Sequence, residues 1–180
     1  MSNSHLIYLS LGSNLGDRFA NLTRAMDSLN GIGVSVLRQS SIYETEPVDV
    51  LDQPWFLNCV LEAKTSLAPL ELLKSLQDVE RQMGSRKLIA RGPRILDLDI
   101  LLYDDVVVHT EEIEVPHPGM AGRRFVLVPL AEIAPAVVHP ALRATIADLL
   151  SATHDRSAVR IWRLPSADPD SSGTGPAGGN

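Results

Sequence analysis

Residues 96–102 read Leu-Asp-Leu-Asp-Ile-Leu-Leu and place two acids, Asp97 and Asp99, inside an apolar run. The run predicts a β-strand, in which successive side chains alternate between the two faces. Both carboxylates then lie on one face, with their Cα atoms roughly 6.5 Å apart. Neighbouring carboxylates repel each other and lose hydration when partly buried, and a divalent cation offsets both costs. The pair therefore indicates a site for one Mg²⁺, or for two ions about 3.5–4 Å apart. An ordinary half-exposed strand shows the same alternation.

A cluster of basic residues precedes this strand. Between residues 81 and 94 the chain carries five basic side chains and no acid, although the whole sequence has 16 Lys and Arg against 22 Asp and Glu. Positive charge concentrated at one place on an acidic protein indicates a local anion site rather than a general nucleic-acid surface. Basic side chains beside a Mg²⁺ site are typical of polyphosphate binding. The alternative is a solvent-exposed loop that is basic by chance.

Length and composition predict one cytoplasmic domain. The chain has 180 residues, of which 44% are hydrophobic, and its single cysteine, Cys59, excludes an intrachain disulfide. We find no apolar stretch of membrane-spanning length and no signal-peptide pattern at the N-terminus. We expect a single domain over residues 1–164 and a disordered Gly/Ser/Pro-rich tail over residues 165–180.

Hydrophobic periodicity and turn residues predict the elements around the Asp strand. We expect strands over residues 6–11, 34–43 and 55–65, a helix that Asp17 caps, and a second helix with Pro69 in its first turn. With the Asp strand, the order is β-α-β-β-α-β, which is the ferredoxin-like arrangement: an α+β fold with an antiparallel sheet and both long helices on one face. Beyond this core we expect a strand over 106–115, paired through the Asp104-Asp105 turn, and helices over 123–133 and 141–150.

Four ordered segments carry a resemblance to a known family. They are LGSNLG at residues 11–16, DQPWFLN at 52–58, RGPRILDLDILL at 91–102, and VPHP at 115–118 followed by RFVLVPL at 124–130. Together they resemble the 6-hydroxymethyl-7,8-dihydropterin pyrophosphokinases of folate synthesis. The similarity runs from about residue 6 to about residue 150.

The resemblance implies that the β,γ-pyrophosphate of ATP is transferred to the hydroxymethyl group of the pterin, with release of AMP. It implies that Asp97 and Asp99 hold two Mg²⁺ ions on the ATP phosphates and that Arg86 and Arg94 act with them in catalysis. The other nucleotide contacts that it implies are Gln77, Glu80, Lys87, Ile100, His117 and Arg123. The pterin contacts that it implies are the stacking pair Phe56 and Phe125, the amide of Asn58 at the ring edge, and Thr45, Val48 and Asp97.

The same resemblance implies small-molecule substrates, no nucleic-acid or membrane partner, and a monomer. The chain departs from the family pattern at Arg91, where an aromatic residue often precedes Gly-Pro-Arg, and at Glu46, where an apolar residue or proline is frequent. Two other functions fit part of the sequence. A Mg²⁺-dependent phosphohydrolase or nuclease would use the same Asp pair, and a non-catalytic ferredoxin-like RNA-binding module would use strand aromatics beside a basic patch.

Overall fold

The computed structural model describes residues 4–85 and 92–165. Its elements, in chain order, are β1 (His5–Ser13), α1 (Arg18–Gly31), β2 (Val34–Gln39), β3 (Tyr43–Thr45), β4 (Phe56–Thr65), α2 (Pro69–Gln82), β5 (Asp97–Tyr103), β6 (Val108–His109), β7 (Glu114–Val115), the 3₁₀ turn η1 (Met120–Gly122), α3 (Arg124–Ile133), α4 (Ile146–Ala152) and β8 (Val159–Ile161).

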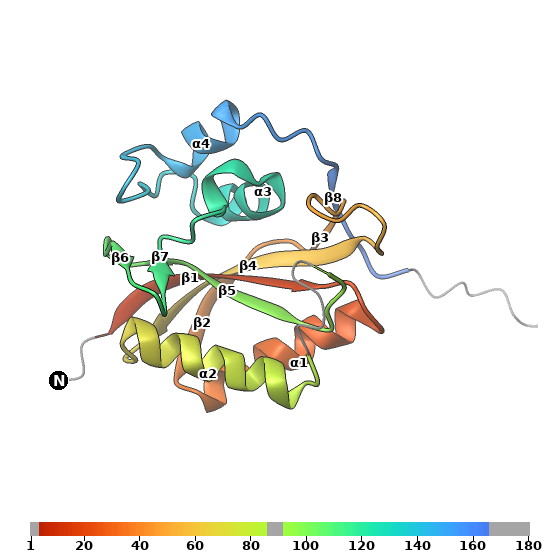
Figure 1. The fold of residues 1–180 in the computed structure, drawn as a ribbon, viewed down its shortest axis with the longest axis horizontal. Helices are drawn as coiled ribbons and strands as arrows, with labels where there is room; N and C mark the ends of the chain where they lie inside the picture. Colours follow the sequence, from red (N-terminus) through yellow and green to blue (C-terminus); the bar gives the residue numbers. More distant parts are fainter. Residues whose placement is uncertain (1–3, 86–91, 166–180) are drawn as a thin grey trace, which may run out of the picture.

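The main sheet is built from antiparallel pairs and has β1 near its centre (Figure 1). β1 pairs with β4 on one side and with β5 on the other. β4 pairs in turn with β2 and β3, and β8 adds to the outer edge of β3. The order of β1, α1, β2, β4, α2 and β5 confirms the predicted ferredoxin-like α+β fold.

The predicted strand over residues 34–43 is two strands, β2 and β3. Strand β2 ends before Ser40, whose hydroxyl accepts a hydrogen bond from the Val60 amide at 2.9 Å. The break turns β3 toward the start of β4, where Tyr43 pairs with Asn58 and Thr45 with Phe56. The predicted site residue Thr45 therefore lies beside two others, Phe56 and Asn58.

Both long helices cover one face of the sheet, as predicted (Figure 1). In α1, Leu22 and Leu29 are fully buried, and in α2, Leu72 and Leu76 are fully buried. They face the sheet because residues four or seven positions apart share one side of a helix. Asp17 caps α1 as predicted: its carboxylate accepts a hydrogen bond from the Ala20 amide at 3.0 Å.

Helix α3 covers the opposite face of the sheet (Figure 1). Its residues Leu127 and Leu130 pack in one cluster with Tyr8 of β1 and Val60 of β4. The predicted start of this helix at Arg123 is the N-cap position, one residue before Arg124. With α3 in place the sheet is buried between two helical layers, and the candidate site opens beside α3.

The C-terminal half differs from the sequence-based expectations at three points. Residues 106–115 do not extend the sheet but form a separate hairpin of β6 and β7, because the chain reverses after Thr110, whose amide donates to the Ile113 carbonyl at 2.9 Å. The expected helix over 141–150 is α4, which begins only at Ile146 because Arg143 has a left-handed backbone (φ 59°) and Thr145 is the N-cap. Strand β8 was not predicted. Within residues 4–85 and 92–165, none of the helices has the length and apolar character needed to cross a bilayer.

Candidate active site

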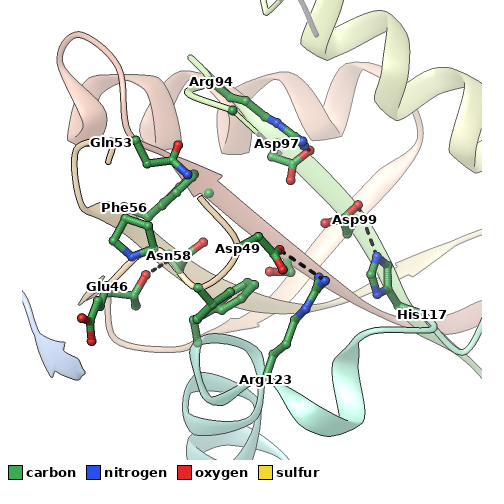
Figure 2. Close-up of a pocket in the computed structure, with 17 residues that line it drawn as sticks. Glu46, Asp49, Gln53, Phe56, Asn58, Arg94, Asp97, Asp99, His117 and Arg123 are labelled. Carbon is green, nitrogen blue, oxygen red and sulfur yellow. Dashed lines mark hydrogen bonds and ion pairs between the residues drawn. The ribbon is translucent and has the colours of Figure 1, made fainter. Parts of the chain in front are cut away.

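A cavity of about 180 Å³ opens at one end of the sheet, between the start of α3 and the loop that joins β3 to β4 (Figure 2). β1, β4 and β5 contribute residues from their site-facing sides, and residues 46–53 and 117–125 form the walls. The lining residues are Ser10, Gly12, Thr45, Glu46, Pro47, Val48, Asp49, Gln53, Phe56, Asn58, Gly92, Arg94, Asp97, Asp99, His117, Arg123 and Phe125.

Asp97 and Asp99 both face this cavity, as the alternation of the strand predicts (Figure 2). Their neighbours Leu98 and Ile100 point the other way, into the core beneath the sheet. The carboxylate of Asp97 has a positively charged side chain beside it: Nη1 of Arg94 lies 2.7 Å from its Oδ1. On the second, Nε2 of His117 lies 3.8 Å from Oδ1 of Asp99.

The imidazole of His117 has a defined tautomer. Its Nδ1 accepts a hydrogen bond from the Gly119 amide at 3.1 Å, so a neutral ring carries its proton on Nε2. Burial lowers the pKa of His117, and the positive charge of Arg123 acts in the same direction. The neutral ring therefore presents an N–H donor toward Asp99 and the cavity.

The amide of Asn58 is held beneath the cavity. Asn58 is buried, and its Nδ2 donates to Oγ1 of Thr45 at 2.6 Å. Gly12, on the neighbouring strand, pairs with Asn58 on one side and with Asp97 on the other. A Cβ at Gly12 would lie 2.5 Å from Oδ1 of Asn58, so the absence of a side chain there leaves room for the amide.

Phe56 lines the cavity from β4, and Phe125 lines it from the first turn of α3. Val48 lines it from the loop between β3 and β4. Arg123 precedes α3, and its guanidinium lies 5.9 Å from the centre of the Phe125 ring. Nη2 of the same guanidinium is 3.6 Å from Oδ2 of Asp49, an ion pair between two residues that line the cavity (Figure 2). All the predicted pterin contacts therefore line one cavity.

Asn14 ties two walls of the cavity together. This buried residue accepts a hydrogen bond from the Arg94 amide on Oδ1 at 2.7 Å. Its Nδ2 donates to Oε1 of Gln53 at 3.0 Å and to the carbonyl of Pro54 at 2.9 Å. One side chain thus fixes the segment before β5 to the loop before β4.

Three predicted nucleotide contacts do not line the cavity. The carboxylate of Glu80 is buried and accepts a hydrogen bond from the Leu98 amide at 2.7 Å, which anchors α2 to β5. Gln77 is an exposed residue of α2, and the Ile100 side chain packs in the core because it alternates with Asp99. The predicted contacts Arg86 and Lys87 lie outside the described residues, as does Arg91.

Several lining residues were not predicted as site residues: Ser10, Gly12, Glu46, Pro47, Asp49, Gln53 and Gly92. Gly12 and Gln53 belong to two segments that carry the family resemblance, LGSNLG and DQPWFLN. Their place in these segments is the sequence feature that could have identified them as site residues. No sequence pattern marks Asp49, because its pairing with Arg123 joins residues that are far apart in the chain.

The donor set fits Mg²⁺ that also binds phosphate. Among the described residues no group of three or more His, Cys, Asp or Glu side chains is placed to hold a metal ion. Two carboxylates that share a cavity with arginines are a small protein donor set. Mg²⁺ sites of this kind take one or two carboxylates and complete the shell with water and substrate phosphates.

Comparisons with known proteins agree on one family. Residues 8–135 match the family described as 7,8-dihydro-6-hydroxymethylpterin-pyrophosphokinase (HPPK). A relative from Bacillus subtilis, 2-amino-4-hydroxy-6-hydroxymethyldihydropteridine pyrophosphokinase, is 44% identical over 164 residues, which cover 91% of this chain and 93% of the relative. The folic acid synthesis protein fol1 of Schizosaccharomyces pombe is 46% identical over 136 residues, or 75% of this chain, but the match spans only 19% of that longer protein.

Among solved structures, a Plasmodium falciparum HPPK-DHPS crystal structure superposes with a TM-score of 0.67. The match covers 84% of this chain and 43% of that one, at 16% sequence identity. At that identity the match supports the fold alone.

Proposed function

The chain belongs to the 7,8-dihydro-6-hydroxymethylpterin-pyrophosphokinase family, and from this membership and the cavity we propose that it transfers pyrophosphate from ATP to 6-hydroxymethyl-7,8-dihydropterin in folate synthesis. The hydroxymethyl oxygen forms a bond to the β-phosphorus of ATP, and the bond from that phosphorus to the α,β-bridging oxygen breaks. AMP leaves, and the hydroxyl proton is lost to solvent. The observation that carries the proposal is that one cavity is lined by both the carboxylate pair and two phenylalanines, Phe56 and Phe125.

The phosphate side of the cavity is the wall formed by β5 and the two flanking cationic segments. Arg94 and Arg123 present guanidinium groups there, and His117 presents an N–H donor. These groups bind anionic oxygens and stabilise the charge that develops on them during transfer. We assign Arg86 and Lys87 to the same role on the resemblance alone.

We assign Asp97 and Asp99 as the protein ligands of two Mg²⁺ ions. When bound, the ions neutralise charge on the phosphate oxygens and lower the pKa of the attacking hydroxyl. Nη1 of Arg94 lies 2.7 Å from Oδ1 of Asp97, so this guanidinium is placed beside any phosphate that binds at that carboxylate. The two carboxylates therefore orient the triphosphate, and a dedicated side-chain base is not needed.

The pterin side of the cavity is the slot between Phe56 and Phe125. A flat heteroaromatic ring gains stacking area between two phenylalanines. Asn58 offers a carbonyl oxygen and an amide N–H₂, and it is fixed by Thr45 in a position to read the ring edge. Val48 lines the same cavity from the loop that joins β3 to β4.

We propose that residues 1–164 form one catalytic domain that acts as a cytoplasmic monomer. The support for one domain is that β1 to β5 and β8 share one sheet, and the monomer rests on the family resemblance. Neither alternative gains support from the structure. The sheet face that an RNA-binding module of this fold would display is covered by α3, and a hydrolase does not account for the slot around Asn58.

The test is product identity. The protein is incubated with ATP and Mg²⁺, with and without 6-hydroxymethyl-7,8-dihydropterin, and nucleotides are separated by ion-exchange chromatography. We expect AMP and the pterin diphosphate in equal amounts, and only when the pterin is present. Release of inorganic phosphate or pyrophosphate without pterin would refute the proposal in favour of a hydrolase.

A further inference from the structure

The segment after α4 links two walls of the cavity from outside the cavity. We call residues 153–161, from the end of α4 through β8, the C-terminal strap. In Figure 1 this segment leaves the α3–α4 layer, descends to the sheet edge and enters β8 beside β3. None of its residues lines the cavity.

The first half of the strap holds the start of α3. Oδ2 of Asp155 accepts a hydrogen bond from the Arg124 amide at 2.8 Å, and Thr153 donates from Oγ1 to the Gly122 carbonyl at 3.2 Å. The N-cap residue of α3, Arg123, makes no side-chain cap bond, so Asp155 supplies the acceptor that the helix start lacks.

The carboxylate of Asp155 is itself fixed. Its Oδ1 accepts a hydrogen bond from the Ser157 amide at 2.8 Å. Partial burial acts to raise the pKa of Asp155, but the hydrogen bonds from Arg124 and Ser157 outweigh it and hold the pKa below its ordinary value. Asp155 is therefore ionised near neutral pH while it caps α3.

The second half of the strap holds the loop wall. The Glu46 amide donates to the Ala158 carbonyl at 3.0 Å, and the Ala158 amide donates back to Oε2 of Glu46 at 3.0 Å. The next strap residue, Val159, pairs with Thr45. Further along β8, Arg160 binds the carboxylate of Glu44 at 2.8 Å. Thr45 and Glu46 line the cavity.

We propose that the C-terminal strap is a positioning element that sets the width of the pterin slot, with Asp155 as its principal residue. The strap joins the α3 turn that carries Phe125 to the strand end that carries Thr45. The far end of α3 is held separately, because Glu132 accepts hydrogen bonds from Ser41 and Tyr43. Without Asp155, the first turn of α3 loses its hydrogen bond to the strap, and the Phe125 end is held less firmly against the loop wall by the packing of Leu127 and the Thr153–Gly122 bond. The inference rests on the proposed function.

The effect should fall on the pterin more than on ATP. A ring stacked between Phe56 and Phe125 needs a fixed separation of the two walls, and a small displacement of α3 removes that contact. The carboxylate pair lies on β5, which is at the opposite end of the strand order from β8. Arg123 also precedes α3, but its long side chain can compensate for a small backbone shift.

The experiment compares steady-state kinetics of the full chain with those of Asp155→Ala and Asp155→Asn. We expect the KM for the pterin to rise about tenfold in Asp155→Ala and about threefold in Asp155→Asn, since an amide oxygen can accept one of the two lost hydrogen bonds. The KM for ATP and kcat should stay within threefold of the parent. Asp148→Ala is the matched control: that carboxylate also caps a helix start, at Thr145, but contacts no cavity residue.

A second pair of variants keeps the test informative if Asp155→Ala is unstable. A chain ending at Leu164 retains the strap and should match the parent, whereas a chain ending at Ala152 lacks it and should show the same selective rise in pterin KM. Circular dichroism below the unfolding midpoint verifies that each variant is folded. Unchanged pterin KM in folded Asp155→Asn and Asp155→Ala, or an equal rise in both KM values, would overturn the positioning role. A parent chain that forms no AMP would refute the proposed function itself.

Discussion

Substitution of Gly12 by alanine probes the centre of the cavity, because Gly12 pairs with Asn58 on one side and Asp97 on the other. Its backbone does not require glycine, since its φ lies outside the left-handed region that the structure records for Gly16, Gly33 and Gly84. The added Cβ would meet Oδ1 of Asn58 at 2.5 Å. The amide must therefore retreat by about 0.9 Å to reach an ordinary van der Waals distance of 3.4 Å.

That retreat weakens the hydrogen bond that holds the Asn58 amide in place. The 2.6 Å bond from Asn58 to Thr45 lengthens toward the limit of a hydrogen bond. A buried amide left without its partner costs about 1–3 kcal/mol. If the cost falls on substrate binding, about 2 kcal/mol weakens pterin affinity about 30-fold. ATP affinity should change much less, because neither Asn58 nor Thr45 is on the phosphate side.

Calorimetric titration with the pterin, in the presence of a non-hydrolysable ATP analogue, measures this loss directly. Gly31→Ala is the control, since a Cβ at Gly31 meets no atom within 4 Å. We expect its pterin affinity to equal that of the parent. Pterin affinity within twofold of the parent in Gly12→Ala would refute the steric reasoning, and so would an equal loss of pterin and ATP affinity.

Three further predictions concern the carboxylate pair, the link between the walls, and pH. Asp97→Ala or Asp99→Ala should abolish AMP formation with an unchanged unfolding midpoint, as measured by chromatography and circular dichroism, because the protein ligands of Mg²⁺ are lost. Asn14→Ala should lower the free energy of unfolding in urea by about 2–3 kcal/mol, because the Arg94 amide and the Pro54 carbonyl lose their partner. The free energy of unfolding should also fall as pH drops from about 7 to 5.5, partly because burial lowers the pKa of His139 in the folded chain. In that range the unfolded chain binds the extra proton, so His139→Gln should reduce the slope in urea titrations at each pH.

Each of these expectations has a contrary outcome. Near-normal turnover in Asp97→Ala or Asp99→Ala would remove the metal assignment. A loss below about 0.5 kcal/mol in Asn14→Ala would show that water replaces its hydrogen bonds. If the free energy of unfolding depended on pH equally in the parent and in His139→Gln, His139 would have the same pKa in the folded and unfolded chains.

The sequence predicted the part of the fold that follows from local alternation. Apolar–acidic alternation placed Asp97 and Asp99 on one face because strand geometry leaves little choice. The Asp17 cap and the Pro69 start were predictable because capping chemistry acts within one turn. The site residues beyond the carboxylate pair came from the family resemblance.

The parts that were missed depend on distant partners. Strand β8 has three residues, too few for a recognisable period, and exists because β3 offers it an edge. The stretch 141–150 has helix-forming composition, but Arg143 has a left-handed backbone (φ 59°). The amides of Ile146 and Ala147 donate to the carbonyls of Val137 and Pro135 instead of to a preceding helical turn. Asp49 was unmarked because its contact with Arg123 forms only once α3 packs on the sheet.

The contact between Arg94 and Asp97 makes ligand binding an exchange of counter-ions. A triphosphate that draws the Arg94 guanidinium toward its own oxygens leaves the Asp97 carboxylate less neutralised, which is an electrostatic penalty. A cation arriving with the nucleotide removes that penalty, and a cation alone must compete with the arginine. Nucleotide and metal are therefore thermodynamically coupled through a single side chain, each raising the affinity of the other.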